Sequence, residues 1–220
     1  MEKRTFEQLD YVCRMPKDFS EGKKYPLVIY LHGAGGRGRD LGIIFEHPFF
    51  SDTTRSLESA ICVAPQCYED SWFSIFEQLQ AFAMHVAAWD CVDEKRVYLV
   101  GASMGGYATW QLAMSRPEMF AAIVPICGGG MYWNAGRLIH MGVWAFHGEK
   151  DETVFCEESK KMVDVINAWG GNARFTVYKD GNHNAWTATF QNEEVWAWLL
   201  SHTSHYQAVQ NKYDNVKEFG

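Results

Sequence analysis

Residues 96–114 read RVYLVGASMGGYATWQLAM, and this stretch decides the fold. The run Arg96–Val100 is short and largely apolar, which predicts a buried strand. Apolar residues at helical spacing then predict a helix over Met104–Met114, closed by Arg116-Pro117. Between the two, the motif GASMG must turn the chain sharply, so that Ser103 stands at the N-terminus of the helix.

The same alternation of short strands and longer helices continues on both sides of this stretch. It predicts an α/β fold with a mostly parallel central sheet and helices on both faces. The other expected strands are Leu9–Met15, which is antiparallel, Tyr25–Leu31, Ala60–Ala64, Phe120–Ile126, Gly142–Phe146 and Ala173–Tyr178. The other expected helices are Trp72–Trp89, Glu157–Trp169 and Glu193–Leu200. We expect one domain over residues 1–201 and a polar tail or weak surface helix over 202–220.

Composition limits the classes of partner. The chain has 220 residues, 47% of them hydrophobic, which suits one domain with a real core. A formal net charge of -7 without a Lys/Arg cluster argues against nucleic acid. The sequence has neither a secretory leader nor a run of about 18 apolar residues, so we expect a cytoplasmic protein without membrane contact. The cysteines are scattered without metal spacing, which predicts free thiols and no metal site.

Two further polar loops follow later strands of the predicted sheet. Residues 147–154 read HGEKDETV and contain Asp151, and residues 179–183 read KDGNH and end on His183. Open α/β sheets place their sites at the carboxyl ends of strands, so Asp151 and His183 are expected beside Ser103. A serine hydroxyl needs an adjacent base to take its proton, and a carboxylate can hold that base in the correct tautomer. The three residues are therefore candidates for a nucleophilic triad.

Several motifs then carry a resemblance to a known family. They are HGAGG at His32–Gly36, APQ at Ala64–Gln66 followed by Trp72, GASMGG at Gly101–Gly106, HGEKDETV at His147–Val154 and GNH at Gly181–His183. With them the chain resembles the esterase branch of the α/β-hydrolase superfamily, near its predicted peptidase, phospholipase/carboxylesterase and feruloyl esterase groups. The resemblance implies an α/β-hydrolase fold with little or no cap, Ser103 as nucleophile, Asp151 as acid and His183 as base. It also implies an oxyanion hole made by the backbone N–H groups of Ala34 and Met104.

The acid of the triad has competitors close by in sequence. Glu149, Glu152 and Asp180 are also carboxylates in these loops, although the family spacing after His147-Gly148 favours Asp151. His147 itself is expected to fix the loop that carries Asp151, and His32 is expected to be structural in its own turn.

Large side chains in the loops are candidates for a substrate pocket. Trp72, Met131, Trp133 and Trp186 lie in loops that are expected to converge near the mouth of the site. Because amphipathic aromatic residues also fill cores, both an acyl pocket and packing remain open for each of them. By contrast, Met104, Tyr107 and Trp110 fit a buried helix face and are expected in the core.

Taken together, these features predict a serine esterase that forms an acyl-enzyme on Ser103 and releases it to water activated by His183, without a cofactor. Family resemblance favours a small-molecule substrate with a short-chain or aromatic acyl group, such as an acetyl or feruloyl ester of carbohydrate. A small peptidase, a thioesterase or a lysophospholipase are alternatives with the same fold. A catalytically silent binding module is the alternative from another class. The sequence indicates no oligomeric state.

Overall fold

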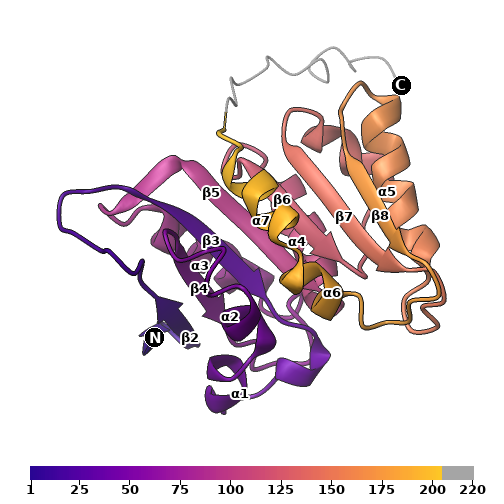
Figure 1. Cartoon of the computed structure of the whole chain (residues 1–220). Helices are drawn as coiled ribbons and strands as arrows, with labels where there is room; N and C mark the ends of the chain where they lie inside the picture. Colours follow the sequence, from indigo (N-terminus) through magenta and orange to yellow (C-terminus); the bar gives the residue numbers. More distant parts are fainter. Residues whose placement is uncertain (205–220) are drawn as a thin grey trace, which may run out of the picture.

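The central sheet has eight strands, which Figure 1 shows side by side. They are β1 (Glu2–Phe6), β2 (Leu9–Arg14), β3 (Tyr25–Leu31), β4 (Ile61–Pro65), β5 (Val92–Ala102), β6 (Ala122–Ile126), β7 (Gly142–Gly148) and β8 (Arg174–Tyr178). Their order in the sheet is β1-β2-β4-β3-β5-β6-β7-β8. β2 pairs antiparallel with β1 and β4, and all other neighbours are parallel. The structure is a computed structural model that describes residues 1–204.

Helices cover both faces of this sheet. The α-helices are α1 (Gly42–Phe45), α2 (Pro48–Asp52), α3 (Phe76–Ala87), α4 (Met104–Ser115), α5 (Cys156–Ala168), α6 (Trp186–Gln191) and α7 (Glu193–Leu200), and the 3-10 helices are η1 (Ala34–Gly36) and η2 (Tyr132–Leu138). No helix among residues 1–204 is long and apolar enough to cross a bilayer.

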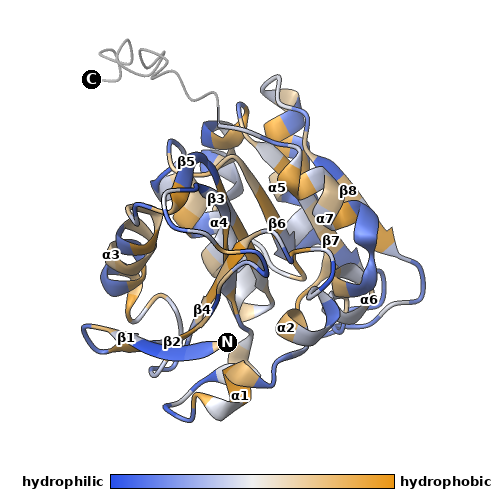
Figure 2. Ribbon diagram, turned by 60° about the vertical axis from the view of Figure 1, so that its left-hand side comes forward, coloured by the Kyte–Doolittle hydropathy of each residue, from blue (hydrophilic) through white to orange (hydrophobic). Residues whose placement is uncertain are grey.

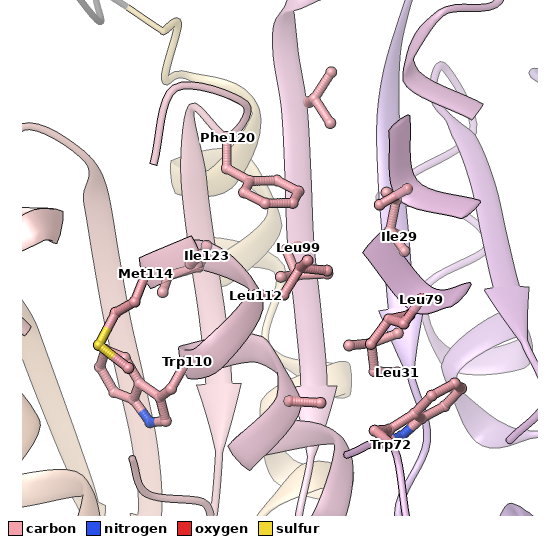
Figure 3. Close-up of a cluster of buried hydrophobic side chains, with 14 of the residues drawn as sticks. Ile29, Leu31, Trp72, Leu79, Leu99, Trp110, Leu112, Met114, Phe120 and Ile123 are labelled. Atoms are coloured by element: carbon pink, nitrogen blue, oxygen red, sulfur yellow. The ribbon is translucent and has the colours of Figure 1, made fainter. Parts of the chain in front are cut away.

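The core consists of two apolar layers, one on each face of the sheet. β3 is buried along its whole length, so its alternate residues belong to different layers. Ile29 lies in the layer that includes residues of α3, α4 and α5, and Tyr30 lies in the layer that includes residues of α2, α6 and α7. Figure 3 shows part of the first layer, where Leu112 of α4 lies beside Leu99 of β5. This two-sided burial is the reason for the nearly continuous apolar runs in the sequence.

The predicted α/β architecture is confirmed, and every predicted strand and helix is present; Tyr25–Leu31 and Glu193–Leu200 have the predicted bounds, and the others have shifted ends. The starts of two elements are shifted by four residues: β5 begins earlier, at Val92, and α3 begins later, because residues 72–75 form turns ahead of it. The connection between β6 and β7, residues 127–141, holds the short η2, in keeping with little or no cap. Of the expected tail, residues 202–204 follow α7, and residues 205–220 lie outside the described part of the chain.

The sequence reasoning missed six short elements: β1, η1, α1, α2, η2 and α6. β1 is an edge strand with the sequence EKRTF, and Figure 2 shows it as a hydrophilic ribbon. Hydrogen bonds to β2 hold β1 in place, and burial contributes little to its stability. Its sequence therefore lacks the alternation of apolar and polar residues by which a strand is predicted. The short helices were missed because three to seven residues are too few for a helical period to stand out.

Candidate active site

The turn between β5 and α4 holds Ser103 in a strained conformation. Its backbone angles are φ 55° and ψ -117°, in a region that side-chain-bearing residues rarely occupy. Such a conformation costs of order 1–3 kcal/mol and persists only where the surroundings impose it. The backbone N–H of Ser103 donates to the Ile126 carbonyl at the end of β6 (2.9 Å), which ties the turn to the neighbouring strand. Ser103 thereby projects from the carboxyl edge of the sheet.

The glycines around Ser103 are required by close packing of backbone. A Cβ on Gly101 would lie 2.3 Å from the Gly105 carbonyl oxygen, and one on Gly105 would lie 1.9 Å from the Leu31 carbonyl oxygen. On Gly106, a Cβ would lie 2.6 Å from the Ile126 carbonyl oxygen. Each of these atoms belongs to the main chain of a neighbouring element, so no side chain can swing away to make room. The GxSxGG pattern is therefore a consequence of how closely α4 approaches β3 and β6.

We expect Gly105→Ala to lower the free energy of unfolding by more than about 3 kcal/mol, because the added methyl group must push α4 away from the end of β3. The measurement is urea unfolding followed by circular dichroism. Gly35→Ala is the matched control, since a Cβ at Gly35 meets no atom within 4 Å. Equal stability of the two variants would contradict the packing explanation.

The structure brings Ser103, His183 and Asp151 together at the carboxyl edge of the sheet. His183 Nε2 lies 2.8 Å from Ser103 Oγ, and His183 Nδ1 lies 2.7 Å from Asp151 Oδ2. Because Nδ1 faces a carboxylate that can only accept, it carries the proton, and Nε2 is free to accept the serine hydrogen. The Trp186 ring meets the His183 ring edge-on, with 5.5 Å between centroids, and supports this orientation. The arrangement can therefore withdraw the Ser103 proton as its oxygen attacks an electrophile.

Asp151 is a buried carboxylate that its own loop keeps ionised. Its Oδ1 accepts hydrogen bonds from the backbone N–H groups of Thr153 and Val154, both at 2.9 Å. Burial acts to raise the pKa of Asp151, but the hydrogen bonds from His183, Val154 and Thr153 outweigh it and hold that pKa below its ordinary value. Asp151 is therefore an anion beside the imidazole at neutral pH.

The competing carboxylates lie at the surface. Asp180 pairs with Lys150, and Glu149 accepts the backbone N–H of Asp180 at 3.0 Å. Glu152 is exposed, next to Asp151 in the same loop. Asp151 is thus the carboxylate that is hydrogen-bonded to His183, and the other three carboxylates face solvent.

The HGAGG loop after β3 borders Ser103. A Cβ built on Gly33 would lie 3.4 Å from Ser103 Cβ and 4.0 Å from Ser103 Oγ, so this loop passes directly beside the hydroxyl. Ala34 begins η1 there, and Met104 begins α4 on the other side. The first N–H groups of a helix have no partner within it, so both N–H groups are available to a ligand at Ser103.

The buried side chains of His32 and Trp72 hold that loop in place by hydrogen bonds to main-chain groups. His32 Nδ1 donates to the Gly33 carbonyl (2.6 Å), and its Nε2 accepts from the Cys67 backbone N–H (2.9 Å). Burial lowers the pKa of His32 to about 4, so the ring stays neutral and structural, as the sequence predicted. Trp72 Nε1 donates to the His32 carbonyl (3.0 Å), and Trp72 is fully buried, as Figure 3 shows. Its candidacy as a pocket residue was wrong, because its indole is used to hold the loop.

An apolar groove of about 570 Å³ lies along α4, the helix that begins directly after Ser103. Tyr107 and Gln111 form one wall, and they lie on the same face of α4 as Ser103 because they follow it at intervals of four residues. Its other lining residues come from the segment ahead of α3, from the first residue of α3 and from the start of the β6–β7 connection; they are Phe73, Phe76, Gly130 and Met131. The groove thus offers room for an apolar or aromatic group beside the helix that Ser103 precedes.

The groove revises the aromatic predictions from the sequence. Among residues 1–204, its wall includes Met131 but not Trp133, which is 66% exposed on η2. Tyr107, expected in the core, is half-buried and faces the groove, whereas Trp110 is fully buried as expected. Sequence reasoning missed Phe73 because the helix was predicted to begin at position 72. The signal in the sequence was a second aromatic residue directly after Trp72, because neighbouring residues of a helix do not share one face.

The thiol of Cys127 is buried next to the triad. The Cys127 sulfur is within 4.8 Å of ligand atoms of Asp151 and His183, which makes this the only cluster of potential metal ligands found among residues 1–204. Burial raises the pKa of Cys127 to about 12, so the group is a thiol and a poor metal ligand. A metal here would also displace the proton between His183 and Asp151. All the cysteines are free, as expected.

The chain is similar to known esterases and, in part, to a peptidase family. Residues 68–135 match the prolyl oligopeptidase family. A probable feruloyl esterase C of Aspergillus terreus is 29% identical over 148 residues, 64% of this chain and 54% of that protein. The corresponding protein of Aspergillus oryzae is 27% identical over 178 residues, 78% of this chain and 66% of that protein.

A solved structure described as a thermostable esterase is 31% identical, with a TM-score of 0.79, over 92% of this chain and 63% of that chain. The chain thus spans between about half and two thirds of the length of these relatives. The sheet order, the strained serine turn and these similarities lead to one conclusion. The chain has the α/β-hydrolase fold and is similar in sequence to esterases.

Proposed function

We propose that this protein hydrolyses carboxylic esters through an acyl-enzyme on Ser103. The observation that carries the proposal is the unbroken chain of hydrogen bonds from Ser103 Oγ through His183 to Asp151, at 2.8 and 2.7 Å. The strained turn that presents Ser103 supports it, because such strain concentrates at functional positions. The similarity to feruloyl esterases supports ester hydrolysis over other acyl transfers.

In the proposed reaction, Ser103 Oγ attacks the ester carbonyl carbon while its proton passes to His183 Nε2. The negative charge on the carbonyl oxygen is received by the N–H groups of Ala34 and Met104. His183 then returns the proton to the departing alkoxide, which leaves an acyl-enzyme. Water attacks this acyl group, His183 takes the water proton, and Ser103 leaves with it. Asp151 stabilises the imidazolium in both halves of the reaction.

The groove favours a short or aromatic acyl group over a long chain. Its walls at Phe73, Phe76, Tyr107 and Met131 offer aromatic and thioether surface, which pairs well with a flat ring. Gln111 and the Tyr107 hydroxyl add polar groups that can meet a phenolic oxygen. We therefore propose acetyl and hydroxycinnamoyl esters, including those carried on sugars, as the substrate class.

Two measurements on the wild type test the function. The first compares kcat/KM for p-nitrophenyl acetate, methyl ferulate and a p-nitroanilide; turnover of both esters with little anilide cleavage is expected. Preferential anilide cleavage would instead favour a peptidase, to which the match with the prolyl oligopeptidase family also points. The second is mass spectrometry after treatment with a fluorophosphonate, which should label the peptide that contains Ser103. Absence of both turnover and labelling would favour a catalytically silent binding module.

The groove assignment has its own test in Phe73→Ala. Phe73 is 51% exposed, so its removal should cost little stability while opening one wall of the groove. We expect kcat/KM for methyl ferulate to fall about tenfold through lost ring contact, with p-nitrophenyl acetate changing less than about twofold. Phe19→Ala is the matched control, since Phe19 is 42% exposed and packs against Tyr25 instead. A proportional loss on both esters in the Phe73 variant would contradict the assignment.

A further inference from the structure

A second histidine contacts the carboxylate of Asp151. His147 of β7 is fully buried, and its Nε2 lies 3.2 Å from Asp151 Oδ2, the same oxygen that lies 2.7 Å from His183 Nδ1. The other oxygen, Oδ1, accepts the N–H groups of Thr153 and Val154. Asp151 therefore faces four N–H groups: three donate to it at 2.7–2.9 Å, and that of His147 lies 3.2 Å away while its shorter hydrogen bond, 2.8 Å, goes to the Val154 carbonyl oxygen. His147 supplies the one donor of this set that belongs to neither the acid loop nor the catalytic base.

The surroundings of His147 decide where its proton lies. Its Nε2 faces two acceptors, the Val154 carbonyl oxygen at 2.8 Å and Asp151 Oδ2, so Nε2 must carry hydrogen. Its Nδ1 lies 2.8 Å from Ser159 Oγ, which is also 2.7 Å from the Gly128 carbonyl oxygen. Burial lowers the pKa of His147, so the ring is neutral, and Nδ1 can accept the Ser159 hydroxyl hydrogen that otherwise goes to Gly128. Ser159 thus orients the ring from α5.

Other titratable groups around the pair carry little charge. Burial raises the pKa values of Cys127 after β6, Tyr107 on α4 and Cys156 at the start of α5, so all three are uncharged at neutral pH. Glu158 on α5 pairs with a lysine one turn along the helix, at 3.3 Å. The charge that acts on His183 at close range is therefore that of Asp151, as modified by its donors.

We propose that His147 is a positioning residue for the triad, whose Nε2–H shares Asp151 Oδ2 with His183 and so limits how tightly the carboxylate holds the His183 proton. The inference rests on the proposed function, in which Asp151 and His183 are acid and base. Each N–H donated to a carboxylate stabilises its negative charge. With the His147 donor removed, more of that charge acts on His183, and the imidazolium persists to higher pH. A base that stays protonated cannot accept the Ser103 hydrogen.

The test compares His147→Leu, which lacks a donor, with His147→Gln, whose amide nitrogen can reach the same oxygen. The measured quantity is the rate at which a fluorophosphonate inactivates Ser103 as a function of pH, which does not depend on the ester that the protein uses. The inactivation rate should rise with pH to a plateau, and we call this rise the rising limb of the pH–rate profile. For His147→Leu we expect the rising limb to move to higher pH by about 0.5–1 unit, and the plateau rate to fall about tenfold. His147→Gln should restore the position of the wild-type limb.

His47→Leu is the matched control, because His47 is also a histidine with a lowered pKa. Burial lowers the pKa of His47 to about 4, and its ring caps α2 by accepting the Phe49 N–H. It should lose stability without moving the limb. An unmoved limb in His147→Leu, or an equal shift in His147→Gln, would overturn the proposal. If His147→Leu does not fold, Ser159→Ala replaces it; this variant must shift the limb in the same direction, and an unmoved limb would refute the role of His147.

The same measurement separates this inference from the proposed function. A wild-type protein that the fluorophosphonate labels at Ser103, but that hydrolyses no ester, would refute the proposed function while the pH comparison still tests His147. A wild-type protein that is not labelled would overturn both, because the triad on which His147 acts would then not activate Ser103.

Discussion

Ser103→Ala is expected to lower kcat for p-nitrophenyl acetate by about 10⁶-fold, because the acyl-enzyme can no longer form. The base and the oxyanion donors remain in this variant, so a small residual rate above the uncatalysed reaction should persist. Alanine keeps a Cβ at the strained turn, where φ is 55°, so the melting temperature should stay close to that of the wild type. The measurement combines steady-state kinetics with thermal unfolding. Intact folding with lost turnover would show that the hydroxyl acts in the chemistry.

Ser51→Ala is a suitable control for this variant, since Ser51 is an exposed residue of α2 whose hydroxyl bonds only its own helix in the described structure. It should retain full activity. Turnover in Ser103→Ala at more than about a hundredth of the wild-type rate would require another nucleophile, since loss of a triad serine leaves far less. Such an outcome would contradict the acyl-enzyme on Ser103.

Asp151→Asn is expected to lower kcat by about 10⁴-fold at neutral pH without unfolding the protein. Oδ1 accepts two backbone N–H groups, from Thr153 and Val154, so the asparagine amide oxygen must take that place. Its NH₂ group then faces His183 Nδ1, which is forced to accept. The ring proton moves to Nε2, and Nε2 can no longer take the proton of Ser103.

The control for Asp151→Asn is Asp180→Asn. Asp180 has a positive φ of 58°, which asparagine tolerates, and its ion pair with Lys150 is exposed. We expect Asp180→Asn to keep nearly all of its activity. A larger loss in Asp180→Asn than in Asp151→Asn, measured as kcat over the same pH range, would reassign the acid of the triad.

The strands, the main helices and the serine turn could be predicted because their signals are local. The apolar run before Gly101 and the helical spacing after Met104 each reflect contacts that any strand or helix in a two-sided sheet must make. The edge strand β1 could not be predicted in this way, because its stability comes from pairing with β2. The lining of the groove could not be predicted either, since Phe73 and Met131 are 58 positions apart in the chain.

The sequence by itself determined the fold class, the strained turn at Ser103 and the order of the three candidate residues along the chain. The tertiary structure alone decided that Asp151 and not its neighbouring carboxylates meets His183, that Trp72 holds a loop while Tyr107 faces the groove, and that His147 shares the oxygen of Asp151. The physical reason is that spacing along the chain fixes which element a residue occupies. The direction of its side chain, and the groups that it meets there, depend on how distant elements pack together.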